Sequence, residues 1–184
     1  MRAARAKARG YADFYAWPID RDLEELGVVS ALAASLQADD ALFFSEARSR
    51  GRPHDPPDCE AVTLDGARIA IEVTELVDGA AIRAYKAGAR YDWADWDSGK
   101  FLAGIAEAIA AKDARFPHLK GAPYEGGYII IIHTDEPVLS LDLVSMFLSG
   151  HHFHKPAHLS RAFLLLSYAP AQERCPYVEL RFEG

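Results

Sequence analysis

A hairpin pattern in residues 60–74 constrains the fold of this 184-residue chain more than any other feature. Residues 60–64 and 68–74 have the composition of β-strands, and the Asp65-Gly66 pair between them is typical of a tight hairpin turn. The second segment, RIAIEVT, alternates strictly, so Glu72 faces away from the isoleucine and valine side chains beside it. The chain should therefore contain an antiparallel pair of strands with a carboxylate in the middle of the returning strand.

Helix and strand patterns alternate along the rest of the chain. Helical spacing of apolar residues occurs in residues 20–36, 100–115 and 139–148, and strand composition in residues 127–133, 161–168 and 177–182. The stretch SRGRPHDPP, residues 49–57, is rich in proline, which excludes a helix interior or a central strand and indicates a loop. This order of elements predicts an α/β fold in which helices flank a mixed central sheet.

Composition indicates an ordinary soluble domain. Half of the residues are hydrophobic, and a chain of this length can bury a core without disulfides or a structural metal. The two cysteines, Cys59 and Cys175, form no CxxC pair, which excludes a zinc ribbon and a disulfide-rich secreted scaffold and favours a cytoplasmic location. No apolar segment approaches the roughly 20 residues that a membrane helix needs. We predict one domain over residues 20–184, preceded by a basic N-terminal arm, residues 1–19.

The net charge of the chain is −7 at pH 7, from 20 basic and 27 acidic residues. This balance argues against a protein that coats nucleic acid through its bulk charge, but it leaves room for a local basic groove. Arg48, Arg50 and Arg52 lie in or beside the proline-rich loop, and they are the residues that we expect to contact nucleic acid.

Two carboxylates flank the predicted hairpin. Asp58 follows two prolines at the mouth of the first strand, and Glu72 lies on the second strand where the hairpin returns beside it. The two side chains can therefore converge from adjacent strands, although Asp58 is also an ordinary turn residue in such a context. Converging carboxylates bind hard divalent cations such as Mg²⁺ or Mn²⁺, which complete their shells with a carbonyl, waters and phosphate. This is the chemistry of phosphodiester hydrolysis.

Two further charged residues fall on apolar helix faces. Glu25 lies within the apolar arc of residues 20–36, and Lys112 lies at the centre of the apolar stripe of residues 100–115. Both side chains should point inward. Simple structural roles are the alternatives: a first-turn glutamate is favoured by the helix dipole, and a lysine can lay its stem over a core and keep its ammonium in water.

The pattern PPD…IAIEVTEL, together with the preceding helix, resembles the PD-(D/E)XK nuclease superfamily, and the longer string is similar to a group of bacterial nuclease-like proteins. The resemblance covers roughly residues 20–135. It implies a restriction-endonuclease-like sandwich, Mg²⁺ or Mn²⁺ as cofactor, and nucleic acid, DNA above all, as substrate. Many enzymes of this superfamily act as dimers, so it is also compatible with a homodimer.

The resemblance also implies a set of metal ligands. Asp58 and Glu72 would bind the ion directly, the carbonyl of Val73 would be a third ligand, and Glu25 would be an outer ligand.

One position departs from the superfamily pattern. Thr74 stands where the superfamily has a lysine that assists the attacking water, and a hydroxyl cannot carry positive charge. In parts of the superfamily this role comes from the helix after the hairpin, which would make Lys112 the basic residue. Thr74 would then hold a metal-bound water or a phosphate oxygen. The expected catalytic set is therefore Asp58, Glu72, Thr74 and Lys112.

Two other functions stay open at this point. The first is a catalytically silent nuclease fold that binds nucleic acid or a partner protein, which Thr74 and the negative net charge favour. The second is a zinc-dependent hydrolase built on the histidine cluster His151, His152, His154 and His158, although no HExxH pattern accompanies it.

Overall fold

The computed structural model describes residues 21–87, 95–167, 169 and 171–184. The expected basic arm, residues 1–19, lies outside the described residues. The helices are α2 (Arg21–Ala38), α3 (Gly79–Lys86), α4 (Ser98–Asp113) and α5 (Leu141–Leu148). The strands are β1 (Phe44–Ser49), β2 (Cys59–Thr63), β3 (Arg68–Glu75), β4 (Gly127–Thr134), β5 (Arg161–Leu166) and β6 (Tyr177–Glu179). Two short 3-10 helices, η1 (Arg52–His54) and η2 (Phe116–His118), lie in the loops.

The six strands form one mixed sheet in sequence order. β1, β2 and β3 make an antiparallel meander, β3, β4 and β5 run parallel, and β6 returns antiparallel beside β5. The turn between β2 and β3 contains Gly66 at φ 93°, a conformation that a glycine adopts without strain. The helix α4 connects β3 to β4, which allows these two strands to be parallel. The predicted α/β fold with a mixed sheet and flanking helices is thus confirmed.

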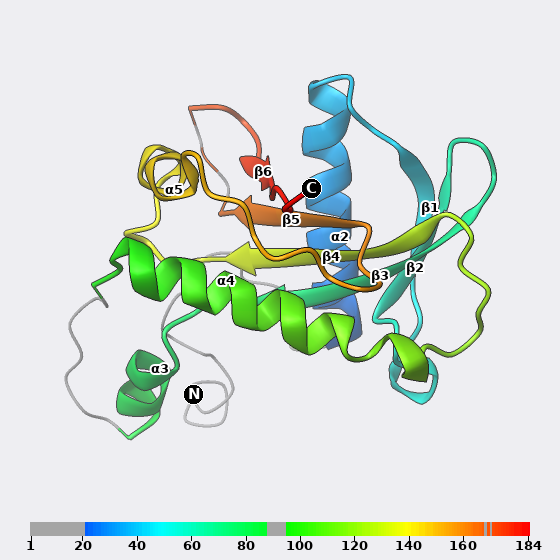
Figure 1. The fold of residues 1–184 in the computed structure, drawn as a ribbon, viewed down its shortest axis with the longest axis horizontal. Helices are drawn as coiled ribbons and strands as arrows, with labels where there is room; N and C mark the ends of the chain where they lie inside the picture. The colour runs from blue at the N-terminus through cyan, green and yellow to red at the C-terminus, as the bar shows by residue number, and fades with distance from the viewer. Residues whose placement is uncertain (1–20, 88–94, 168, 170) are drawn as a thin grey trace, which may run out of the picture.

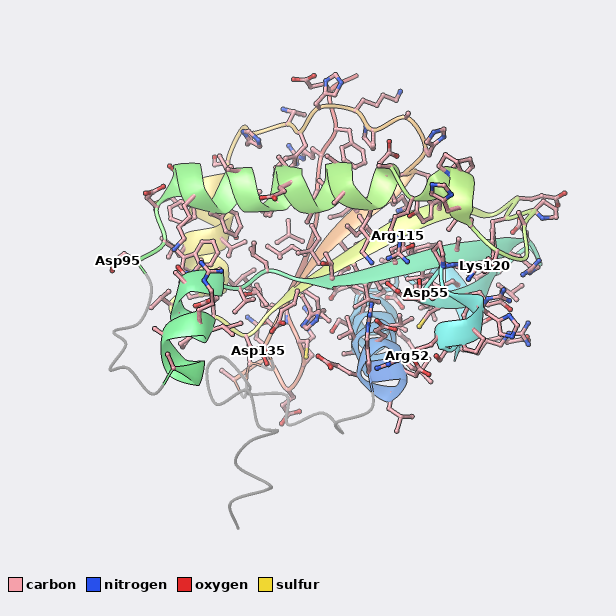
Figure 2. All side chains as sticks on the ribbon, turned by 90° about the horizontal axis from the view of Figure 1, so that it is seen from below. Arg52, Asp55, Asp95, Arg115, Lys120 and Asp135 are labelled. Atoms are coloured by element: carbon pink, nitrogen blue, oxygen red, sulfur yellow. The ribbon has the colours of Figure 1, made fainter. Side chains whose placement is uncertain are left out.

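The sheet is covered on both faces. α4 lies across one face and α2 crosses the other, as the two views in Figure 1 and Figure 2 show. Alternate residues of β4 serve the two sides: Ile130 and Ile132 pack in the core under α4, and Ile129 and Ile131 pack in the core under α2. This two-sided burial explains the uninterrupted apolar run of that strand. Among the described residues, no helix has both the length and the apolar character needed to span a bilayer.

The alternation in β3 is confirmed, and it decides where the site forms. Ile69, Ile71 and Val73 belong to the core under α2, whereas Ala70 belongs to the core under α4. Glu72 therefore projects toward α4, and its side chain is fully buried.

Two elements of the fold are missing from the sequence prediction. β1 was not expected, because its pairing with β2 is interrupted by a bulge between Ser45 and Arg48 and its residues do not alternate regularly. The short helix α3 was not expected either. Several ends also differ: the last predicted strand stops at Glu179 and the last predicted helix begins only at Leu141, where the Ser140 hydroxyl caps it.

Candidate functional site

The site forms at an open edge of β3. Cys59, the first residue of β2, pairs with Ile71, so β3 continues from Glu72 with β4 on one side and no strand of the described residues on the other. Asp58 lies beside this edge, where its Oδ2 accepts a hydrogen bond of 2.8 Å from the backbone N–H of Val73. The start of β2 thus brings the Asp58 carboxylate to the residue that follows Glu72.

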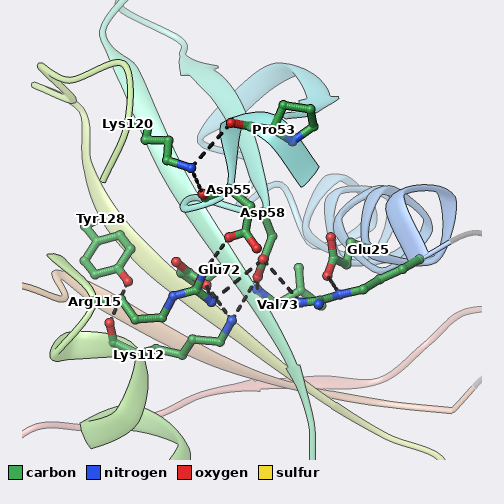
Figure 3. Close-up of polar contacts among 11 residues, drawn as sticks. Glu25, Pro53, Asp55, Asp58, Glu72, Val73, Lys112, Arg115, Lys120 and Tyr128 are labelled. Carbon is green, nitrogen blue, oxygen red and sulfur yellow. Dashed lines mark hydrogen bonds and ion pairs between the residues drawn. The ribbon is translucent and has the colours of Figure 1, made fainter. Parts of the chain in front are cut away.

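Lys112 joins the two carboxylates. It lies in the last turn of α4, and its Nζ donates to Asp58 Oδ2 at 2.9 Å and to Glu72 Oε2. Figure 3 shows the three side chains meeting: Asp58 lies just before β2, Glu72 on β3 and Lys112 on α4. The Tyr128 hydroxyl of β4 donates to the Lys112 carbonyl at 2.6 Å, which ties the end of the helix to the sheet. The predicted inward direction of Lys112 and the convergence of Asp58 with Glu72 are confirmed.

Arg115 is a residue of this site that the sequence analysis missed. Its guanidinium donates to Glu72 Oε2 at 2.8 Å, lies 3.9 Å from Asp58 Oδ1, and pairs with Asp55 of the proline-rich loop. The signal was present in the sequence, because Arg115 follows Lys112 by three residues and therefore continues the same side of the helix.

Glu25 reaches the site from the opposite face of the sheet. It is buried on α2, as its place in the apolar arc predicts, and it accepts a 2.5 Å hydrogen bond from Arg21. The Arg21 guanidinium in turn lies 3.7 Å from Asp58 Oδ1. Burial raises the pKa of Glu25 above its ordinary value, and the negative charge of Asp58 raises it further.

A small pocket opens beside these groups. It has a volume of about 190 Å³, and its walls come from α2, β3, β4 and α4. The lining residues are Arg21, Glu24, Glu25, Val73, Thr74, Glu75, Lys112 and His133. The pocket therefore brings the expected residues Glu25, Thr74 and Lys112 to one space, large enough for a few water molecules or a phosphate group.

The two central carboxylates have different acidities. Burial raises the pKa of Glu72 to about 7, and the nearby charge of Asp58 adds to this effect. Burial also acts on Asp58, but the Lys112 ammonium and the Val73 N–H more than offset it and hold the pKa of Asp58 below its ordinary value. Asp58 is therefore the permanent anion of the pair, and Glu72 is the group that exchanges a proton near neutral pH.

The donor atoms suit a hard divalent cation in part. Asp58 Oδ1 and Glu72 Oε1 are buried and have no hydrogen-bond partner among the described residues. The N–H and C=O of one residue in an extended strand point the same way, so the Val73 carbonyl faces the open edge together with its N–H. Two carboxylates and a carbonyl are a set that Mg²⁺ or Mn²⁺ accepts when waters complete the shell.

Two observations limit this fit. No group of three or more His, Cys, Asp or Glu side chains in the described part of the chain is gathered for a metal ion, so Glu25 does not join the pair directly. The Lys112 ammonium also holds the space between the two carboxylates. An ion that binds both of them has to displace this ammonium.

The three arginines that we expected to contact nucleic acid differ in their partners. Arg48 and Arg50 both donate to the buried carboxylate of Glu60, at 2.7 and 3.1 Å. Arg52 lies exposed on η1. Two of the three arginines therefore have a partner within the protein.

The histidine cluster lends no support to a zinc site. His154 pairs with Glu183 at 3.3 Å, and the His158 ring stacks on Phe116 with centroids 4.1 Å apart. The four imidazoles are thus not gathered around a common centre.

Comparison with known proteins adds nothing to this geometry. No protein-family model matches the chain, and neither a curated protein nor a solved structure matches it. The function has to be inferred from the site itself.

Proposed function

We propose that this protein is a metal-dependent hydrolase of nucleic-acid phosphodiester bonds with a restriction-endonuclease-like fold. The observation that carries the proposal is the meeting of Asp58, Glu72 and Lys112 at the open edge of β3. Two carboxylates beside one lysine, supplied by a hairpin and the helix that follows it, are the arrangement that the resemblance to PD-(D/E)XK nucleases implies.

The chain's own groups divide the work. Asp58, Glu72 and the Val73 carbonyl would hold Mg²⁺ or Mn²⁺, and Glu25 would be an outer ligand. When bound, the ion lowers the pKa of a water and neutralises charge on the phosphate. Once the ion replaced its ammonium between the carboxylates, Lys112 would be able to stabilise the charge that develops on the phosphoryl oxygens. The Thr74 hydroxyl, which lines the same pocket, orients a water or a phosphate oxygen.

Calorimetric titration with Mn²⁺ tests the metal site. The comparison is between the wild type, the isosteric double variant Asp58→Asn/Glu72→Gln, and a control, Glu107→Gln, which removes an exposed carboxylate from α4. We expect binding in the wild type and the control and none in the double variant. Cleavage of short DNA and RNA strands is then measured with the same proteins. A wild type that binds no Mn²⁺ would refute the proposal.

A silent binding module is the second candidate, and a specific observation favours it. The buried charges of Asp58 and Glu72 are already compensated by Lys112 and Arg115 without any metal. A protein of this kind would bind nucleic acid or a partner protein without cleaving it. The double variant would then bind the nucleic acid or partner as the wild type does, and neither protein would cleave nucleic acid. For a nuclease, the wild type would cleave and the double variant would not.

Location and assembly belong to the same proposal. A cytoplasmic location fits a chain with no CxxC pair and a nucleic-acid substrate. A homodimer would allow both strands of a duplex to be cut. Light scattering of the purified protein with and without a DNA duplex tests the second point.

A further inference from the structure

A second charged centre lies on the sheet beside the acid pair. Its centre is the buried carboxylate of Glu60 on β2, two residues after Asp58 and hence about 7 Å along the extended chain. Three arginines converge on it: Arg48 at 2.7 Å, Arg50 at 3.1 Å and Arg68 at 2.8 Å. We call Glu60 and these three arginines the Glu60 cluster.

The cluster carries more positive charge than its carboxylate needs. One carboxylate balances one guanidinium, so the cluster has two positive charges in excess. Glu46 is exposed and lines the same pocket as Arg48 and Arg68, where it offsets part of this excess. Arg50 also keeps its buried Nε without a hydrogen-bond partner among the described residues. A set of cations held together around a single buried anion is thus prepared for a further anion.

Two of the arginines are open to solvent. The side chain of Arg48 is 72% exposed and that of Arg68 is 39% exposed, whereas that of Arg50 is only 17% exposed. Arg48 and Arg68 line a pocket of about 260 Å³ on β1, β2 and β3. The Tyr124 ring lies 4.7 Å from the Arg68 guanidinium and restrains it. Arg48 and Arg68 can therefore accept an anion while Glu60 keeps them in position.

The Glu60 cluster is continuous with the acid pair. Arg50 donates to the Lys120 carbonyl at 3.2 Å, and the Lys120 ammonium donates to the carbonyls of Pro53 and Asp55 in the proline-rich loop. Asp55 pairs with Arg115, which contacts Glu72. Figure 2 shows Arg115, Lys120 and Asp55 on one side of the molecule, and Figure 3 shows the Lys120 ammonium bonded to Pro53 and Asp55. Arg50, Lys120 and Arg115 therefore form a series of positively charged side chains between the Glu60 cluster and Glu72.

We propose that Arg48 and Arg68, held by Glu60, bind backbone phosphates of the nucleic acid next to the phosphodiester that reaches Asp58 and Glu72. The inference rests on the proposed function for the identity of the ligand, and it adds Arg68 and a positioning role for Glu60. A single structural ion pair would leave no positive charge for a phosphate, whereas the excess charge of the Glu60 cluster does. Phosphate contacts of this kind fix the register of the strand and carry no sequence preference.

The test measures binding of a labelled oligonucleotide by fluorescence anisotropy in the presence of EDTA, between about 50 and 200 mM salt. Arg48→Gln and Arg68→Gln should each weaken binding about fivefold at the lower salt concentration and reduce the slope of log K against log salt by about one. The control is Arg181→Gln, an exposed arginine after β6 at the other edge of the sheet, and it should bind as the wild type does.

The variant Glu60→Gln changes the result in the opposite direction. It removes the negative charge of the Glu60 cluster but keeps a side-chain oxygen that can accept from an arginine and hold it in place. A protein that stays folded, as checked by circular dichroism, should therefore bind the oligonucleotide a few times more tightly. Arg48→Gln is decisive even if another variant fails to fold, because its side chain is mostly in solvent. Wild-type affinity and an unchanged salt slope in Arg48→Gln and Arg68→Gln would overturn the proposal, and so would a wild type that does not bind.

The two proposals can fail separately. EDTA removes any divalent cation, so the binding assay does not depend on the acid pair as a metal site. A protein that binds no Mn²⁺ but loses affinity in Arg48→Gln would refute the nuclease and support the phosphate contact. A protein that cleaves DNA but binds it equally well in both arginine variants would do the reverse.

Discussion

Replacing Lys112 by methionine should destabilise the protein severely. Methionine keeps an unbranched stem of similar length but removes the ammonium, which lies 2.9 Å from Asp58 Oδ2 and also bonds Glu72. The side chains of Asp58 and Glu72 are 1% and 0% exposed, so water cannot replace the lost charge. Breaking a buried ion pair on one side costs about 3–5 kcal/mol. Arg115 still contacts Glu72 at 2.8 Å, which places the expected loss near the lower end, at about 3 kcal/mol.

The assay is urea unfolding followed by circular dichroism, with EDTA present and at a pH well above 7. Two comparisons make it specific. The double variant Lys112→Met/Glu72→Gln should recover part of the lost free energy of unfolding, because both charges of the Lys112–Glu72 pair are then absent and only Asp58 has lost its partner. The penalty in the single variant should also shrink well below pH 7. Since the folded pKa of Glu72 is raised to about 7, this carboxyl is protonated there and needs no ammonium.

A loss below about 1 kcal/mol would refute this reasoning, since it is the size expected for an exposed ion pair. The same conclusion would follow if Glu72→Gln failed to rescue Lys112→Met. Either result would mean that Arg115 or penetrating water, rather than Lys112, compensates the acid pair.

Three further outcomes are expected. Mn²⁺ competes with a proton for Glu72, so its apparent affinity should fall up to tenfold per pH unit below about pH 7 and level off above it in calorimetric titrations; a flat profile would exclude Glu72 as a ligand. Arg115→Gln should strengthen Mn²⁺ binding, because it removes a cation that lies 2.8 Å from Glu72 Oε2, and calorimetric titration beside the wild type checks this; an unchanged affinity would mean that the ion does not bind at Glu72. Burial raises the pKa of Glu60, but hydrogen bonds from Arg68 and Arg48 outweigh it and lower the pKa overall. The stabilisation from Glu60 should therefore be complete above pH 4.5 and disappear as the pH falls through the lower folded value, and acid unfolding of Glu60→Gln should lack this component.

Local patterns in the sequence were sufficient to place the central residues of the site. The alternation of residues 68–74 predicted which face of the sheet Glu72 lies on, and the helical spacing of residues 100–115 predicted that Lys112 points toward the protein interior. Each of these patterns depends only on neighbours within one element, which is why it can be read without knowing the sheet.

The missing parts depend on pairing between elements. The sequence did not identify Glu60 as a site residue, because its partners Arg48 and Arg68 lie on two other strands and only the folded sheet defines their registers. For the same reason Arg48 and Arg50 were expected to be free nucleic-acid contacts, whereas both meet Glu60. The bulge in β1 removed the alternation that would have identified this strand, and with it the neighbour of β2.

The open edge of β3 has a consequence for how the protein behaves in concentrated solution. A strand with unpaired backbone groups is a template on which strands of other chains can add, and this leads to aggregation. Here Asp58 already occupies the Val73 N–H, and the charges of Glu72, Lys112 and Arg115 would all have to lose their water or their partners before a foreign strand could pair. The side chains of the proposed active site thus also protect this edge from pairing with strands of other chains. Variants that neutralise the acid pair remove part of that protection, so they should aggregate more readily than the wild type even where the fold is intact.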